Sequence, residues 1–225
     1  MPREKVILFD TTLRDGQQTQ GVDFSVQDKV NIANALDNIG IDYIEGGWPG
    51  ANPTDTKFFE NKNNFSNAKF TAFGMTKRSG RSADNDPQLR SLIDAHSDSV
   101  CLVAKTWDFH VDLALGISLE ENIEAIKESV LSVKASGKEP LIDCEHFFDG
   151  YKSNSEFSFK CIEAALESGA EWVVLCDTNG GTLPNEIFNI VEEITKKFPG
   201  DKIGIHCHND TENAVANSLA AIDAG

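Results

Sequence analysis

Short apolar runs alternate along the chain with longer stretches in which apolar residues recur at a helical period. Seven runs of four to seven residues are typical of buried strands, and they span residues 6–9, 41–47, 69–73, 99–104, 140–144, 172–176 and 202–206. Amphipathic helices are predicted between them, most clearly at 25–40, 119–137 and 185–200. Several of these stretches begin with Ser, Thr or Asn and end with Gly, as capped helices do. The pattern therefore predicts repeated strand–helix units.

Seven strand–helix units favour an α/β fold of the (β/α)₈ TIM-barrel type over an open doubly wound sheet. No G-x-G-x-x-G motif follows the first strand, as a dinucleotide-binding sheet would require. The last residues, SLAAIDAG, fall inside or just past the seventh helix, so we expect the barrel to be truncated after about the seventh unit, without strand 8. Because no Pro-rich or Ser-rich linker interrupts the pattern, we expect one catalytic domain over 1–225, incomplete at its C-terminus.

Charge and cysteine content exclude several classes of function. Twenty Lys and Arg against thirty-six Asp and Glu give a formal charge of −16, which disfavours nucleic acid or an anionic membrane as a partner. The five cysteines form no C-x-x-C pair and are predicted to be reduced and buried. With no secretory segment and no apolar stretch long enough to span a membrane, the expected location is the cytoplasm.

Polar residues cluster where the predicted strands end. In barrels of this type the carboxyl ends of the strands carry the chemistry. Here those ends hold Asp10, Arg14, Asp15, Glu45, Glu145, Asp177, Thr178, His206 and His208. Carboxylates and histidines that converge on one mouth suit a divalent metal ion with oxygen and nitrogen ligands.

Blander interpretations remain for individual residues. His206 and His208 share one face of a strand, but an isolated pair of this kind is also compatible with two core histidines. Asp177 could cap the turn that follows it, and Glu45 could pair with a neighbouring cation. It is the combination with the other polar strand ends that favours the metal site.

At these residues the sequence resembles a known family. DTTLRDG after the first strand, with HCHND after the seventh, is similar to the metal-dependent acyl-CoA condensing enzymes and lyases. That family includes isopropylmalate, homocitrate and citramalate synthases and hydroxymethylglutaryl-CoA lyase. The segments IEGGWPGANPTD, EHFFDGYK and LCDTNGGTLP resemble the citramalate synthase branch more closely.

The resemblance implies a set of metal ligands. Asp15, His206 and His208 are expected to hold a divalent ion, which would be Mn²⁺, Mg²⁺ or Zn²⁺. The family takes its fourth protein ligand from an asparagine after strand 8, and neither Asn179 nor Asn209 matches that position. An inactive fragment that needs a further C-terminal segment is therefore one alternative.

The resemblance also implies substrates and catalytic residues. Arg14 would be the catalytic cation, Glu145 would contact the 2-oxo acid or orient the acetyl group, and Thr178 would bind the substrate carboxylate. The implied reaction condenses acetyl-CoA with a 2-oxo acid in branched-chain amino-acid biosynthesis, in a protein that is a homodimer at full length. Pyruvate, giving citramalate, is the expected oxo acid, because Trp48 and Phe147 near strand ends would narrow the pocket. A 2-isopropylmalate or homocitrate synthase and a hydroxyacyl-CoA lyase are the alternative activities.

Overall fold

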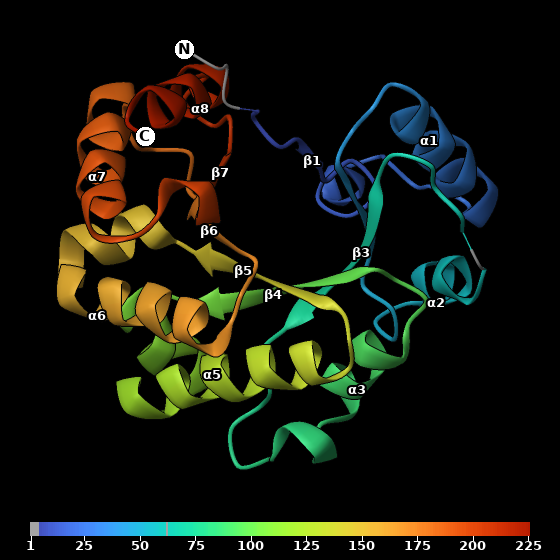
Figure 1. Ribbon diagram of the computed structural model, residues 1–225, viewed down its shortest axis with the longest axis horizontal. Helices are drawn as coiled ribbons and strands as arrows, with labels where there is room; N and C mark the ends of the chain where they lie inside the picture. The colour runs from blue at the N-terminus through green and yellow to red at the C-terminus, as the bar shows by residue number, and fades with distance from the viewer. Residues whose placement is uncertain (1–4, 62) are drawn as a thin grey trace.

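The computed structural model describes residues 5–61 and 63–225, and its strands form one parallel sheet (Figure 1). The seven strands lie in the order of the sequence: β1 Phe9–Asp10, β2 Tyr43–Gly47, β3 Lys69–Met75, β4 Ser99–Lys105, β5 Glu139–Glu145, β6 Trp172–Asp177 and β7 Ile203–Cys207. Each strand pairs with its neighbours in sequence, as in a TIM barrel. The predicted α/β fold, a TIM barrel truncated after the seventh unit, is confirmed.

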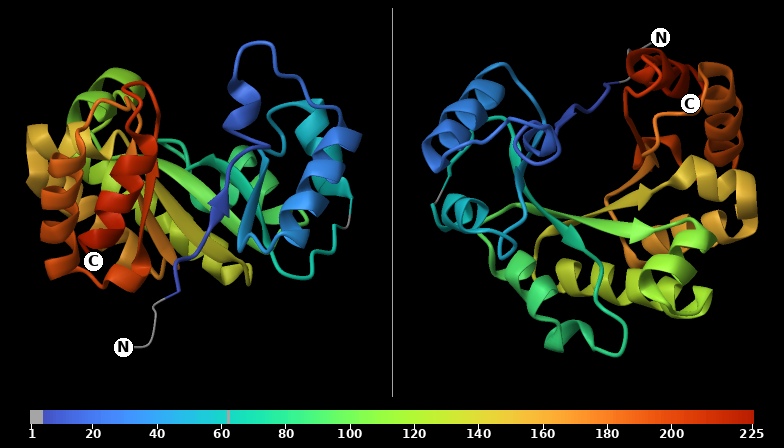
Figure 2. Two further views of the ribbon diagram at one scale, coloured as in Figure 1. Left: turned by 90° about the horizontal axis from the view of Figure 1, so that it is seen from above. Right: turned by 180° about the vertical axis from the view of Figure 1, so that it is seen from behind.

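The helices cover the outer side of the curved sheet (Figure 2). They are α1 Val26–Asn38, α2 Pro53–Glu60, α3 Pro87–Asp94, α4 Asp108–His110, α5 Leu119–Ala135, α6 Phe147–Ser168, α7 Pro184–Lys197 and α8 Ala214–Asp223. The three helices predicted most clearly correspond to α1, α5 and α7. The Ser25 side chain accepts from the Asp28 N–H, and the Asp28 carboxylate accepts from the Ser25 N–H, so a capping box begins α1 at the expected place.

The first strand is shorter than predicted and begins later. β1 contains only Phe9 and Asp10, whereas the apolar run suggested 6–9. Val6 and Leu8 are 50% and 52% exposed. Among the described residues β1 pairs with β2 alone, so the apolar residues before it have only one neighbouring strand. At the other edge of the sheet, β7 pairs with β6 alone within the residues that the structure describes.

Alternate residues of the strands enter two different apolar clusters. Val100 and Leu102 belong to the outer core beneath the helices, whereas Cys101 belongs to an inner cluster. The inner cluster also contains Tyr43, Phe73 and Leu141, with Trp48 packed against it. Because side chains alternate across a strand, the inner face carries residues that the helices cannot cover. Polar side chains for a site come from this face and from the loops at the carboxyl ends.

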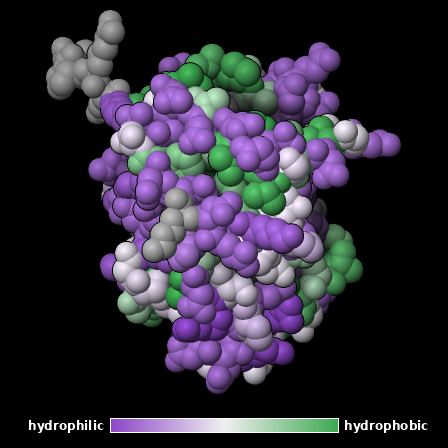
Figure 3. Space-filling view, turned by 90° about the vertical axis from the view of Figure 1, so that its right-hand side faces the viewer, coloured by the Kyte–Doolittle hydropathy of each residue, from purple (hydrophilic) through white to green (hydrophobic). Residues whose placement is uncertain are grey.

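The hydrophilic surface and the free cysteines are consistent with the charge and cysteine content of the sequence. The face over α1 and α2 is mostly hydrophilic (Figure 3). No helix among the described residues has the length and apolarity needed to cross a bilayer. All five cysteines are free, and four of them are buried as predicted, whereas Cys207 is partly exposed.

Candidate metal centre

The segment after β1 makes a tight turn that presents Arg14 and Asp15. The backbone N–H groups of residues 14–16 all donate to the Thr11 carbonyl, at 3.1, 2.9 and 3.1 Å. Leu13 is fully buried in the outer core and anchors the turn. The two residues that follow it therefore extend to the carboxyl ends of other strands, where their contacts lie.

Asp15 meets the two histidines at the end of β7. Its Oδ2 lies 3.5 Å from His206 Nε2 and 3.3 Å from His208 Nε2. One potential ligand atom from each of the three residues lies within 4.8 Å of the others, and all three side chains are partly exposed. We call this set the triad. It lines an open hollow of about 580 Å³, so the structure brings together the three residues predicted as metal ligands.

Arg14 bridges the triad to the end of β2. Its Nε donates to Glu45 Oε2 at 2.6 Å and its Nη1 donates to Asp15 Oδ1 at 3.2 Å. The guanidinium also stacks over Phe73, 4.0 Å from the ring centroid. Glu45 is fully buried, and its ion pair with Arg14 confirms the interpretation that it pairs with a cation. Burial alone would lower the pKa of Arg14, but the Glu45 carboxylate raises that pKa overall.

The contacts of the triad and of Glu45 shift the pKa values of these groups. Hydrogen bonds from His206 and His208 hold the pKa of Asp15 well below its usual range. The hydrogen bond to Asp15 in turn raises the pKa of His208. Burial raises the pKa of Glu45 to about 7, although Arg14 opposes the shift. Asp15 is therefore an anion that favours positive charge beside it, whether protons or a metal ion supply that charge.

Glu145 and Thr178 lie at the ends of β5 and β6 but do not join the triad. Glu145 forms an ion pair with Lys105 at the end of β4. The Thr178 hydroxyl accepts from the backbone N–H of His146 at 2.8 Å. Within the described part of the chain, no hydrogen bond or ion pair connects either side chain to the triad. Their roles toward a substrate stay predictions.

Asp143 is the polar residue of this region that the sequence pattern did not reveal. It is 5% exposed and lies two residues before Glu145 on β5, so it shares the inner face. Its carboxylate lies within 4.8 Å of potential ligand atoms of Cys176 and His206. Burial raises the pKa of Asp143. A single Asp within the apolar run PLIDC was the available signal, because an apolar strand seldom buries a lone carboxylate.

Two other residues have structural roles. Asp177 is 1% exposed and accepts from the Thr182 hydroxyl at 2.9 Å and from the Thr182 N–H at 3.3 Å, so the capping interpretation is confirmed. The expectation that Phe147 narrows a pocket is wrong. Phe147 begins α6, is fully buried in the outer core and packs against Phe148. Trp48 does reach the inner cluster, where its ring lies edge-on to Phe73 with centroids 5.8 Å apart.

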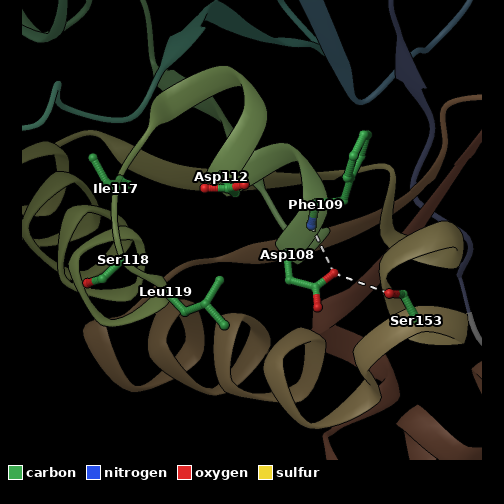
Figure 4. Close-up of a pocket in the computed structure, with 7 residues that line it drawn as sticks. All are labelled: Asp108, Phe109, Asp112, Ile117, Ser118, Leu119 and Ser153. Carbon is green, nitrogen blue, oxygen red and sulfur yellow. Dashed lines mark hydrogen bonds between the residues drawn. The ribbon is translucent and has the colours of Figure 1, made fainter.

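A second hollow of about 500 Å³ lies between α4, the π-helical turn η3 (Val111–Leu115) and the start of α5 (Figure 4). Ser153 on α6 donates to Asp108 at its edge, at 3.3 Å. This hollow shares no lining residue with the one at the triad. None of the site residues predicted from the strand ends lines this second hollow.

A family model described as HMGL-like matches residues 5–225. The chain belongs to the HMGL-like family. Among curated members it is 55% identical to an (R)-citramalate synthase of Aquifex aeolicus, across 99% of this chain and 42% of that protein. It is 51% identical to the (R)-citramalate synthase of Geobacter sulfurreducens, across 98% and 42%. A 2-isopropylmalate synthase of Sulfolobus acidocaldarius is 34% identical, across 99% and 55%. This HMGL-like chain thus spans about two fifths of the citramalate synthases it matches.

Solved structures agree on the HMGL-like fold. The HMG-CoA lyase of Bacillus subtilis superimposes with a TM-score of 0.83 at 20% identity, covering 99% of this chain and 75% of that chain. The HMG-CoA lyase of Brucella melitensis gives 0.81 at 16% identity, covering 99% and 79%. At this level of identity the likeness establishes the fold alone.

Proposed function

We propose that this chain is the metal-binding catalytic part of an acyltransferase that condenses acetyl-CoA with pyruvate to give citramalate and CoA. The convergence of Asp15, His206 and His208 beside Arg14 carries the proposal. The 55% identity to a citramalate synthase favours pyruvate over the larger oxo acid of the isopropylmalate synthase, which is 34% identical.

The triad fits a divalent ion. One carboxylate oxygen and two imidazole nitrogens form a ligand set that Mn²⁺, Mg²⁺ and Zn²⁺ accept, and the open hollow gives a small substrate access to it. A bound ion supplies a Lewis acid that polarises the keto group of a 2-oxo acid. We infer that Asp15, His206 and His208 hold it.

Arg14 supplies fixed positive charge beside the ligands. Its Nε and Nη1 are held by Glu45 and Asp15, and Nη2 has no hydrogen-bond partner among the residues that the structure describes. A preorganised donor of this kind stabilises the oxygen that gains negative charge when the new carbon–carbon bond forms. Because Glu45 is buried, the guanidinium is held in one orientation.

The strand ends next to the triad complete the proposed substrate site. We infer that Glu145, paired with Lys105, orients the acetyl group or the oxo acid, and that Thr178 binds the substrate carboxylate. Trp48 and Phe73 form an apolar wall beneath Arg14. An apolar wall discriminates by only ~1 to 3 kcal/mol per methylene, so slower turnover of 2-oxobutyrate is expected.

Metal binding is testable apart from catalysis. Calorimetric titration of the EDTA-treated chain with Mn²⁺ should show one site, which Asp15→Asn, His206→Ala and His208→Ala should each weaken. His96→Ala is the matched control, because His96 is exposed and lies outside the triad. Unchanged affinity in all three triad variants would refute the site.

The reaction is tested by free-thiol release from acetyl-CoA with pyruvate, 2-oxobutyrate and 2-oxoisovalerate, with products identified by mass. Pyruvate should be preferred and citramalate formed. A preference for 2-oxoisovalerate would instead identify an isopropylmalate synthase. Formation of acetyl-CoA from a hydroxyacyl-CoA, without condensation, would identify a lyase.

A further inference from the structure

Lys29 on α1 is a fully buried cation that the proposed chemistry does not use. Its Nζ donates to the Leu13 carbonyl at 2.8 Å and to the Gly46 carbonyl at 3.0 Å, and it forms an ion pair with Asp55 at the start of α2. An ammonium has three protons, so these three acceptors satisfy it completely. Burial of a charge at such a point is expensive unless every partner is in place.

The two carbonyls lie next to residues of the site. Leu13 directly precedes Arg14, and Gly46 directly follows Glu45. Arg14 and Glu45 are themselves joined by the 2.6 Å hydrogen bond. The Lys29 ammonium therefore ties the backbone of the turn after β1 to the backbone at the end of β2, one residue from each member of the pair.

Asp55 extends this connection to the loop after β2. Its Oδ2 accepts from the Trp48 N–H and from the Asn52 side-chain amide, both at 2.9 Å. Trp48 packs against Phe73, the ring that lies under the Arg14 guanidinium. One buried ion pair thus holds both the backbone beside Arg14 and the apolar wall beneath it.

We propose that Lys29 is a positioning residue that sets where Arg14 and Asp15 lie relative to β2 and to the two histidines of the triad. The inference rests on the proposed metal site. Groups that hydrogen-bond metal ligands commonly change metal affinity by roughly 10- to 100-fold when they are removed, and Lys29, which fixes the backbone two residues before Asp15, is expected to act within that range. A residue that only fills the core would change stability and leave the folded site as it was.

Lys138 provides a matched control. It is also a partly buried lysine, and its Nζ donates to the Ser97 hydroxyl at 3.0 Å and to the Leu92 and Ala95 carbonyls. It directly precedes β5, at the amino end of the strands and hence on the opposite side from the triad. Lys138→Met removes a partly buried ammonium that also has three hydrogen-bond acceptors, without touching the site.

The experiment compares Lys29→Met, Lys138→Met and the double variant Lys29→Met/Asp55→Asn. Each is measured for thermal midpoint, for Mn²⁺ affinity by calorimetry, and for the NMR resonance of the Arg14 Nε–H group, assigned by its loss in Arg14→Lys. Lys29→Met should lower the midpoint, weaken Mn²⁺ binding roughly 10- to 100-fold and shift the resonance. Lys138→Met should lower the midpoint only.

The double variant separates the loss of the Lys29 contacts to the backbone from the effect of leaving the Asp55 carboxylate without its cation. It leaves no unpaired buried charge and keeps at position 55 an oxygen that can accept from the Trp48 N–H, so it should recover part of the midpoint but not the Mn²⁺ affinity or the resonance. It also replaces Lys29→Met in the comparison if that variant fails to fold. Wild-type affinity and an unshifted resonance in a folded Lys29 variant would overturn the inference. If the wild-type chain fails to bind Mn²⁺, the proposed metal site fails, while the resonance still tests the role of Lys29.

Discussion

At the residue scale, Arg14 has both a structural role and a place at the site. Its side chain is 12% exposed and contacts a buried carboxylate, a triad carboxylate and an aromatic ring. A guanidinium presents a planar fork that can meet two carboxylates at once, whereas an ammonium is a point charge. Arg14 is therefore built into the fold as well as directed at the site, and its replacement should affect both.

We expect Arg14→Lys to keep the pairing with Glu45 but lose the bridge to Asp15. Turnover should fall by about 10²- to 10³-fold, the usual effect of removing a donor that stabilises the transition state. The thermal midpoint should fall only modestly, because a charge stays beside Glu45. Steady-state kinetics and calorimetry on the same preparation measure both. Normal turnover would remove Arg14 from the mechanism, and failure to fold would make it purely structural.

His208 should titrate in the metal-free chain with a pKa above its ordinary value of 6.5, because Asp15 accepts from it. The stabilisation that this contact provides should be fully present below pH 6.5 and be lost as the pH rises through the folded-state pKa. The histidine ring resonances of the EDTA-treated chain report the midpoint. In Asp15→Asn the midpoint should move down, and an unchanged midpoint would mean that Asp15 does not set it.

At the scale of elements, the end of β2 depends on glycine for a packing reason. Gly47 has φ +134°, and a Cβ there would lie 2.6 Å from the Asp55 carboxylate. The Asp55 carboxylate occupies the space where this Cβ would lie, because it pairs with the Lys29 ammonium and accepts from the Trp48 N–H. The segment EGGW is therefore shaped by what approaches it from α1 and α2.

Gly47→Ala should lower the thermal midpoint more than Gly21→Ala does. Both glycines have positive φ, +134° at Gly47 and +85° at Gly21, so alanine introduces backbone strain at both and more of it at Gly47, whose φ lies well beyond the left-handed region. At Gly21 a Cβ would meet nothing within 4 Å, so only Gly47→Ala also displaces Asp55. Thermal unfolding of the two variants gives the comparison. Equal losses would show that neither the larger φ nor the Asp55 contact adds to the cost at Gly47.

At the scale of the whole molecule, the triad joins the two ends of the sheet. Asp15 follows β1 and the histidines end β7, yet within residues 5–61 and 63–225 these two strands do not pair with each other. A metal held by the triad would therefore connect segments about 190 residues apart that no strand pairing joins among the described residues, and it would stabilise the folded state in which they meet.

Mn²⁺ should accordingly raise the thermal midpoint of the EDTA-treated chain. A ligand that binds only the folded state at 100 times its Kd adds about 2.7 kcal/mol. Hydrogen exchange should also slow in the turn after β1 and at the end of β7. Asp15→Asn is the control and should show neither effect. An equal shift in that variant would place the ion elsewhere.

Much of the fold and part of the site could be read from local patterns. Buried strands are apolar along their whole length and helices repeat at 3.6 residues, so the strand positions and the order of units were visible before any contact was known. Asp15, His206 and His208 were also identifiable, because the strand period places the two histidines on one face and the family motifs mark all three.

Only the tertiary structure decided which charges meet. Lys29 lies in an amphipathic helix, where a lysine ordinarily belongs to the solvated face, yet it is the fully buried partner of Asp55, 26 residues away. The Arg14–Glu45 pair and the proximity of Asp143 to His206 likewise depend on how the sheet curves. Sequence periodicity assigns a side chain to a face of its own element. The distance between faces of separate elements is set by packing, and that distance selects the groups that pair, position and bind.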